Sequence, residues 1–289
     1  MGGETRRSNS AGESVWLAPV DWRSRYRLWR QGARQVRREW ASYDDISVPL
    51  ADLGVDIVPY RVDVPAFWRY VDECRYREMT YWDGGRARAG TEKWLEHFVS
   101  IDLLRPGAND VLIDIASSSS PFPDIVRERW QCRTYRHDLL YPAGRTGDRI
   151  GSDAADLPIA DESVDGLTLH CSFEHLEGDR DIGFLREADR VLRPGGQLCI
   201  VPIYFNRTYC IQTDLRAWHA HAPDLGRDAL VCVAAGWGDV HGRFYDPEQF
   251  AERILNNLGR LRVTLYTVEN YLDVAQDCYL KFVAVFRKT

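Results

Sequence analysis

Short apolar runs alternate with amphipathic segments along the second half of the chain. The runs rich in β-forming residues predict six strands, at 111–116, 133–137, 164–171, 197–203, 261–268 and 279–286. Apolar residues with a helical period lie between them and predict helices near 121–131, 179–192 and 247–258. This alternation is typical of βαβ units. We therefore expect an α/β fold: a doubly wound, mostly parallel sheet with helices on both faces.

The first part of the chain has a helical pattern instead. An apolar and aromatic stripe predicts one long helix through Trp22, Tyr26, Trp29, Ala33, Val36 and Trp40. Further helices are expected near 66–80 and 91–104, after a connection that contains Pro49, Pro59 and Pro65. The sequence thus predicts an N-terminal helical arm and lid over 1–104 and a sheet domain over 105–289. A long insertion at 205–246 interrupts that domain and is expected to cover the acceptor.

Charge is distributed unevenly. The net charge is -6, yet residues 1–43 contain nine arginines and four acidic residues. The arm could contact RNA, a membrane surface or an anionic substrate through these arginines. The stripe is more typical of a packing face, buried on its own domain or in a homodimer. The acidic remainder argues against nucleic acid as the main partner.

The composition is that of a globular chain, since 45% of the 289 residues are hydrophobic. No apolar run approaches the roughly 18 residues that cross a bilayer, and the N-terminus has no apolar signal segment. The seven cysteines contain no CxxC pair and predict free thiols. We expect a cytoplasmic protein without membrane association.

Two features at strand ends suggest a ligand site. The turn after the first strand of the sheet domain, from Asp114 to Ser120, contains four serines and leads into a helix. Ligands of doubly wound sheets lie at this edge, so the turn could hold a carboxylate or phosphate. Asp138 ends the second strand, where a carboxylate commonly binds the two hydroxyls of a ribose. An aspartate could also fall there by chance.

The region 91–289 resembles the class I S-adenosylmethionine-dependent methyltransferases of the small-molecule type. The resemblance rests on an ordered set: Asp153-Ala154, Leu157-Pro158, Asp165, Glu174-His175-Leu176 and Leu192-Arg193-Pro194-Gly195-Gly196. It implies a seven-stranded sheet and S-adenosylmethionine as cofactor. It also implies a set of cofactor-binding residues: Asp114, Ile115, Ala116, Ser117, Ser118, Ser119, Asp138, Asp153, Ala154 and His170. Within this set, Asp153 and Ala154 are expected at the adenine.

One departure concerns the first loop, which is usually glycine-rich in that family. Here Ala116, Ser118 and Ser120 stand at the glycine positions. A left-handed backbone costs a residue with a Cβ on the order of 1 kcal/mol. We therefore expect the loop to follow a different path while retaining the cofactor.

For the chemistry, the resemblance implies His175 as first candidate for a general base, and His170 is the second. Either histidine could instead serve in packing or in a hydrogen bond at a helix start. Tyr204 could donate to the acceptor or form a wall of its pocket. Glu174 is expected to face solvent or cap the next helix. His219 and His221 with Asp224 could be metal ligands, but their spacing fixes no further ligand, so no metal is expected. A nicotinamide dehydrogenase would need G-x-G-x-x-G after the first strand, which is missing.

The function expected is methyl transfer from S-adenosylmethionine to an oxygen, nitrogen or carbon of a small-molecule acceptor such as a sugar, natural product or metabolite. Two alternatives remain open. The chain could be a catalytically silent binding or partner subunit, or it could methylate RNA or protein through its basic arm.

Overall fold

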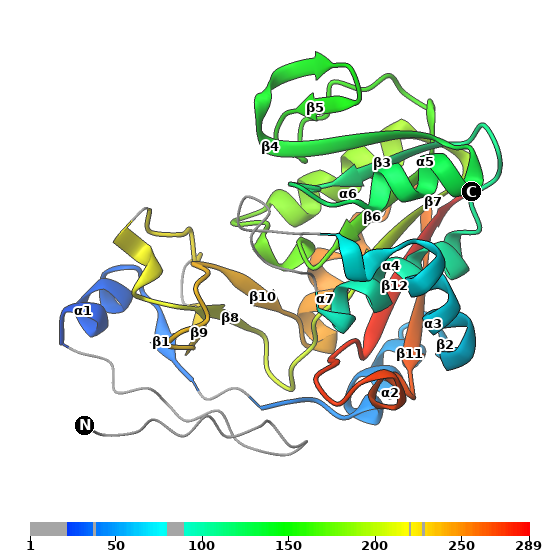
Figure 1. The fold of residues 1–289 in the computed structure, drawn as a ribbon. Coiled ribbons are helices and arrows are strands. Elements are labelled where there is room, and N and C mark those ends of the chain that lie inside the picture. Colours follow the sequence, from blue (N-terminus) through cyan, green and yellow to red (C-terminus); the bar gives the residue numbers. More distant parts are fainter. Residues whose placement is uncertain (1–21, 37–38, 80–89, 220, 227–228) are drawn as a thin grey trace, which may run out of the picture.

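The computed structural model describes residues 22–36, 39–79, 90–219, 221–226 and 229–289, and these form two sheets. The larger sheet has eight strands in the order β2-β11-β12-β7-β6-β3-β4-β5. Its strands are β2 (Asp56–Tyr60), β3 (Val111–Ile115), β4 (Arg133–Thr146), β5 (Arg149–Gly151), β6 (Val164–His170), β7 (Leu192–Val201), β11 (Leu261–Val268) and β12 (Phe282–Lys288). Figure 1 shows the smaller sheet projecting from one side of the larger one.

The larger sheet confirms the doubly wound prediction. Its neighbouring strands are parallel, apart from β12, which is antiparallel to both β7 and β11. All six predicted strands are present, and β11 has the predicted bounds. An eighth strand, β2, pairs in parallel with β11 at the edge, which the seven-stranded expectation did not include.

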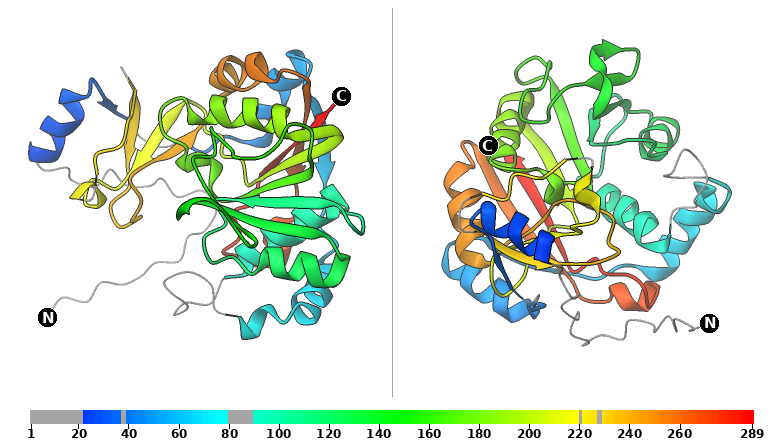
Figure 2. Two further views of the ribbon diagram at one scale, coloured as in Figure 1. Left: turned by 90° about the horizontal axis from the view of Figure 1, so that it is seen from above. Right: turned by 90° about the vertical axis from the view of Figure 1, so that its left-hand side faces the viewer.

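Helices cover both faces of this sheet (Figures 1 and 2). One hydrophobic cluster contains residues of α3 (Val64–Glu73), α4 (Thr91–Leu104) and α5 (Phe122–Trp130). The other contains residues of α2 (Tyr43–Asp52), α6 (Arg180–Val191) and α7 (Pro247–Arg253). Short helical turns follow at η1 (Tyr76–Glu78), η3 (Phe173–His175), η4 (Ala217–His219), η5 (Leu255–Asn257) and α8 (Tyr271–Val274). The carboxyl ends of β3, β4, β6 and β7 therefore meet at one edge between two helical layers.

The second predicted strand is longer than expected, so Asp138 lies within β4 and does not end it. Residues 136–138 pair in parallel with β5, and residues 143–146 return along that same strand. The backbone carbonyl oxygen of Pro142 lies only 2.1 Å from where a Cβ on Gly151 would stand. Glycine at 151 thus allows the bend of β4 to close over the end of β5.

The insertion at 205–246 forms most of the smaller sheet, which has the order β1-β9-β8-β10. Its strands are β1 (Arg34–Gln35), β8 (Cys210–Thr213), β9 (Leu230–Val233) and β10 (Gly242–Phe244). A small hydrophobic cluster, which includes Leu28, Trp218 and Val231, packs beside it. The insertion is therefore a folded unit built jointly with the N-terminal arm.

The prediction of one helix from Trp22 to Trp40 is wrong beyond Arg30. Helix α1 (Trp22–Arg30) ends before Gly32, whose φ is 74°, and Arg34 then donates its backbone N–H to Ala229 as β1 joins β9. Tertiary strand pairing thus overrides the helical period. Among the apolar and aromatic side chains of α1, Leu28 is buried, whereas Tyr26 and Trp29 are 52% and 71% exposed.

The aromatic stripe is therefore not buried on its own domain, and its burial in a dimer stays a prediction. The arginines at 6, 7, 37 and 38, and the side chains of Trp22 and Arg25, lie outside the described residues.

Residues 39–79 also contain more helix and strand than predicted. Pro49 lies inside α2, Pro59 lies in the edge strand β2, and Pro65 is in the first turn of α3. Proline is tolerated in β2 and in the first turn of α3, because edge strands and first helical turns do not require a backbone N–H to donate at every position. The proline-containing connection is thus a helix and a strand, and the helix expected at 66–80 is α3 followed by η1. The division of domains at residue 105 itself stays a prediction.

Across the described ranges, every helix is too short or too polar to traverse a lipid bilayer.

Candidate functional site

Three residues with a left-handed backbone gather at the carboxyl edge of the larger sheet. Ala116 and Ser118, after β3, have φ values of 52° and 46°, and Cys171, after β6, has a φ of 52°. Each conformation costs a side chain with a Cβ about 1 kcal/mol or more. The expectation that the serine loop would leave the glycine path is wrong at these two positions. Strain of this kind collects at functional sites.

The carboxylate of Asp138 fastens this loop to β4. Its Oδ2 accepts the backbone N–H of Ser118 at 2.8 Å, and its Oδ1 accepts that of Leu140 at 2.9 Å. Tyr141 completes the contact by donating its hydroxyl to the carbonyl oxygen of Ser118. Each carboxylate oxygen has a second lone pair and can accept a further hydroxyl.

Leu139 and Leu140 were missed by the sequence analysis. They flank the bend of β4 and are 70% and 85% exposed, beside the buried carboxylate of Asp138. Two exposed leucines at this edge provide an apolar surface for a flat ring. The sequence does contain a signal, because two apolar residues directly follow Asp138. Since the strand was predicted to end at 137, these leucines were not assigned to it.

The next strand end carries Asp153 and Ala154. Asp153 accepts the backbone N–H of Ala155 at 3.0 Å and pairs with Arg180, whose Nε lies 2.8 Å from Oδ2. Burial acts to raise the pKa of Asp153, but these two hydrogen bonds hold it below its ordinary value. Ala154 is buried. The carboxylate of Asp153 is therefore ionised and forms an ion pair with Arg180.

Asp114 and His170 face each other at the ends of β3 and β6. His170 Nδ1 lies 2.9 Å from Asp114 Oδ1, which also accepts the hydroxyl of Thr168 at 2.8 Å. His170 Nε2 lies 3.0 Å from the hydroxyl of Ser100 on α4. Both ring nitrogens are thus engaged inside the protein, so His170 positions α4 against the sheet.

The remaining loop residues divide into buried and exposed positions. Ile115 is buried, Ser119 is exposed, and Ser117 is buried with a hydroxyl that has no partner. Ser172, after β6, has a second buried hydroxyl without a partner. Buried hydroxyls without partners cost free energy that a polar ligand would recover.

His175 is held by the backbone of a distant segment. Its Nδ1 lies 2.5 Å from the carbonyl oxygen of His241, and His241 Nδ1 lies 2.9 Å from the carbonyl oxygen of Glu174. A carbonyl only accepts, so Nδ1 of His175 carries a proton, and in the neutral form of the ring the lone pair is therefore on Nε2. The ring stacks on Trp237 at 5.8 Å between centroids. The orientation of His175 at this edge is thus fixed by a hydrogen bond and a stacked ring.

The prediction that Glu174 faces solvent or caps a helix is wrong. It is 4% exposed, its Oε1 accepts the thiol of Cys171 at 3.2 Å, and its Oε2 has no partner. His175 Nε2 lies 3.6 Å from Oε1, which is too long for a hydrogen bond. Glu174 is therefore placed to stabilise a positive charge on His175.

A second buried acid, Glu96 on α4, lies on the same side. It pairs with Lys93, whose Nζ lies 2.6 Å from Glu96 Oε2 and 3.1 Å from the carbonyl oxygen of His170. Burial raises the pKa of Glu96 to about 8, although Lys93 acts to lower it. The sequence analysis missed it because α4 was expected to belong to an outer lid.

Tyr204, just after β7, completes this group. Its hydroxyl lies 3.2 Å from the thiol of Cys171, and its ring stacks on Tyr279 at 6.3 Å. Burial, with the nearby Cys171, raises its pKa well above the ordinary value. Tyr204 is thus a neutral donor beside Glu174.

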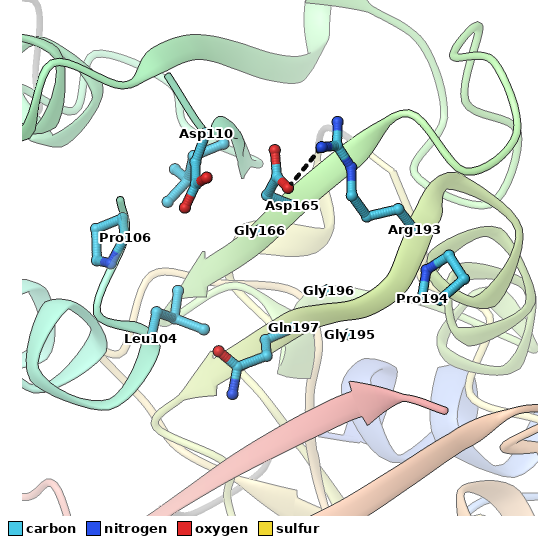
Figure 3. Close-up of a pocket in the computed structure, with 11 residues that line it drawn as sticks. Leu104, Pro106, Asp110, Asp165, Gly166, Arg193, Pro194, Gly195, Gly196 and Gln197 are labelled. Carbon is cyan, nitrogen blue, oxygen red and sulfur yellow. Dashed lines mark ion pairs between the residues drawn. The ribbon is translucent and has the colours of Figure 1, made fainter. Parts of the chain in front are cut away.

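A hollow of about 230 Å³ lies at the opposite edge of the sheet and is distinct from this site (Figure 3). It is lined by the Pro194-Gly195-Gly196 turn, and Asp165 there pairs with Arg193 at 3.0 Å. Asp165 also accepts the backbone N–H of Val111 at 2.7 Å. These polar groups already have partners, so the turn is structural.

The described residues hold no group of three side chains arranged to bind a metal ion. His219 Nδ1 lies 3.0 Å from the carbonyl oxygen of Arg216, and His221 Nε2 lies 2.8 Å from Glu177. Ala220 between them lies outside the described residues.

The central part of the chain is similar to a known protein family. Residues 134–200, from β4 to β7, match the family described as "Methyltransferase domain". A search of curated proteins found no match.

Several solved structures are similar to the chain. The Burkholderia thailandensis 1,6-didemethyltoxoflavin-N1-methyltransferase, with bound 1,6-didemethyltoxoflavin and S-adenosylhomocysteine, is 14% identical with a TM-score of 0.49; the match covers 88% of this chain and 94% of that one. The putative methyltransferase in complex with the Haloferax volcanii Trm112 activator is 15% identical with a TM-score of 0.45; coverage is 76% and 96%. The Streptomyces coelicolor geranyl diphosphate C-methyltransferase is 13% identical with a TM-score of 0.41; coverage is 67% and 79%.

Proposed function

We propose that this chain is a class I S-adenosylmethionine-dependent methyltransferase and that it methylates a small-molecule acceptor at the carboxyl edge of its larger sheet. The match of residues 134–200 to the methyltransferase domain family supports this proposal. The observation that carries this proposal is the orientation of His175. The carbonyl of His241 fixes its tautomer, Trp237 supports its ring, and its Nε2 is left to accept a proton.

The cofactor fits the residues between β3 and β5. Asp138 has lone pairs for the ribose hydroxyls, and Leu139 and Leu140 offer an apolar surface for the adenine ring. The unpaired hydroxyls of Ser117 and Ser172 suit the polar methionine end. When bound, S-adenosylmethionine supplies an activated methyl group on a sulfonium.

Further parts of the edge support the cofactor. The loop from Asp114 to Ser119 faces it with left-handed residues that expose backbone, and Asp153 with Ala154 lies beside the adenine. His170 is a positioning residue here, since both its nitrogens are used by Asp114 and Ser100.

The acceptor lies against the side chains that follow β6 and β7. His175 takes the proton that the acceptor releases, and Glu174 stabilises the imidazolium that forms. Tyr204, held neutral by burial, turns its O–H from the sulfur of Cys171 to donate a hydrogen bond to the bound acceptor. The chain's main contribution is orientation, because a fixed near-attack geometry provides much of the rate of such a displacement.

A cytoplasmic location and a homodimer through α1 remain predictions. The exposed pair Tyr26 and Trp29, stacked at 5.8 Å, is the surface that such a dimer would cover.

The proposal is tested with S-adenosylmethionine labelled on its methyl group. The protein is incubated separately with a small-molecule extract, with total RNA and with protein. We expect label only in the small-molecule fraction. Label in RNA would favour the basic arm as the acceptor site, and no label in any fraction would favour a silent subunit.

The role of the base is tested with His175→Gln, which keeps a polar side chain but cannot accept the proton. We expect the rate of transfer to fall about 10²- to 10⁴-fold, with cofactor affinity kept. His219→Gln, on an exposed histidine of the smaller unit, is the matched control. An unchanged rate in His175→Gln would rule out this base.

A further inference from the structure

We propose that the acceptor presents a positively charged nitrogen, as an amine or a protonated N-heterocycle, to the carboxyl groups of Glu96 and Glu174. This inference rests on the proposed function, since it names the acceptor class of the same site. Tyr204 and Tyr279 form the aromatic wall of this subsite.

The two carboxyl groups are short of partners. Glu96 is fully buried and Glu174 is 4% exposed, and in each one oxygen, Oε1 of Glu96 and Oε2 of Glu174, has no hydrogen-bond donor. Lys93 pairs with the other oxygen of Glu96 at 2.6 Å, and the thiol of Cys171 donates to the other oxygen of Glu174. Buried carboxyl oxygens without a donor are costly, so an ammonium group that donates to them would be stabilised.

The surroundings favour a cation over other groups. Cys171 joins the carboxyl group of Glu174 to the aromatic wall, since its sulfur lies 3.2 Å from the hydroxyl of Tyr204 and 3.8 Å from that of Tyr279. Tyr279 is 40% exposed, so the wall reaches the surface. Aromatic rings attract cations, and the carboxyl oxygens of Glu96 and Glu174 accept hydrogen bonds from an N–H, whereas a carboxylate or phosphate acceptor brings no donor to them.

The same placement serves the transfer step. A nitrogen beside Glu174 is also beside His175, whose Nε2 lies 3.6 Å from Glu174 Oε1. The ammonium first gives one proton to His175 Nε2, which frees the nitrogen lone pair. That pair forms the new C–N bond with the methyl carbon as the C–S bond breaks, and the electrons of the broken bond stay on sulfur. Charge and atoms therefore balance without another reactant.

The test uses three probes with one carbon skeleton: phenethylamine, 2-phenylethanol and 3-phenylpropionate. Each is titrated calorimetrically into protein saturated with S-adenosylhomocysteine. We expect phenethylamine to bind at least tenfold more tightly than the neutral and anionic probes. Equal binding of the three, or no binding of the amine, overturns the inference.

Two variants locate the effect. Glu174→Gln and Glu96→Gln keep the shape of the side chain and replace one carboxyl oxygen with an amide NH2, which donates and cannot accept a hydrogen bond. Each is expected to weaken the binding of phenethylamine at least tenfold. Glu269→Gln, on an exposed carboxylate that pairs with Arg61, should leave binding unchanged. Amine binding that survives in both site variants overturns the inference.

S-adenosylhomocysteine binding is measured first in every variant and reports folding of the site. If the wild-type protein does not bind S-adenosylhomocysteine, the proposed function itself is rejected. If it binds S-adenosylhomocysteine but does not prefer the amine probe, only the acceptor class is rejected.

Discussion

Ala116 keeps a left-handed backbone where glycine would be unstrained, with a φ of 52°. Replacing it by glycine relieves on the order of 1 kcal/mol of strain, partly offset by the greater freedom of glycine in the unfolded chain. We expect Ala116→Gly to leave the free energy of unfolding unchanged or raise it by up to about 1 kcal/mol in denaturant titrations.

The matched control is Ala160→Gly in an exposed loop, where φ is not left-handed. It should lower stability by a few tenths of a kcal/mol to about 1 kcal/mol. A loss in Ala116→Gly as large as in the control would contradict the strained loop.

Single residues could be named from the sequence where a motif fixed them. His175 follows the strand predicted at 164–171; the structure shows its Nδ1 against the carbonyl oxygen of His241, and its role as a base stays a prediction. Glu174 and Glu96 could not be predicted as buried, because charged residues are normally exposed and only the packing of α4 against β6 encloses them. The strain at Ala116 was predicted as a cost, but whether the loop would accept it depends on Asp138 holding Ser118.

At the scale of elements, the bend of β4 over β5 depends on Gly151. A Cβ there would lie 2.1 Å from the carbonyl oxygen of Pro142 and 2.5 Å from that of Tyr141. We expect Gly151→Ala to displace the bend and cost about 1–3 kcal/mol of stability, as overpacking does. Because the bend carries Leu139 and Leu140, cofactor affinity should fall as well, measured by calorimetry.

Gly107→Ala is the control for this change. A Cβ there meets only the side chain of Asp110, at an ordinary 3.4 Å. If Gly151→Ala and Gly107→Ala bound the cofactor with equal affinity, the bend of β4 would have no part in the site.

Helices and strands were predicted well where the hydrophobic period of a segment matches the element that the segment forms in the packed fold. Helix α4 has the predicted bounds, and α5 and α6 lie within a residue or two of theirs. The long helix through Trp40 failed because Gly32 stops it and because β1 pairs with β9, a strand nearly 200 residues later. The smaller sheet was not predicted, since its strands have at most four residues and come from two distant segments.

For the whole molecule, a buried ion network joins the two sheets. Asp181 on α6 pairs with Arg243 of β10 at 2.7 Å and with Arg253 of α7 at 2.6 Å, and it accepts the hydroxyl of Tyr245. We expect Asp181→Asn to cost about 3–5 kcal/mol, because it leaves the buried guanidinium of Arg243 and the partly buried one of Arg253 short of a counter-charge. Denaturant titrations measure this loss.

Glu269→Gln, which removes an exposed pair with Arg61, should cost less than about 1 kcal/mol. Burial acts to raise the pKa of Asp181, but the two arginines hold it below its ordinary value. Its contribution is therefore complete above about pH 4 and is lost as pH falls through the lowered pKa. If Asp181→Asn lowered the free energy of unfolding by no more than Glu269→Gln does, the buried network would not hold the two sheets together.

The central claim is that S-adenosylmethionine binds at the carboxyl edge beside Asp138. The most direct measurement is a calorimetric titration of the wild-type protein, Asp138→Asn and the exposed control Asp52→Asn with S-adenosylmethionine. We predict one site per chain, an affinity at least tenfold weaker in Asp138→Asn, and no change in the control. No heat with the wild-type protein, or equal affinities in all three, would contradict the account.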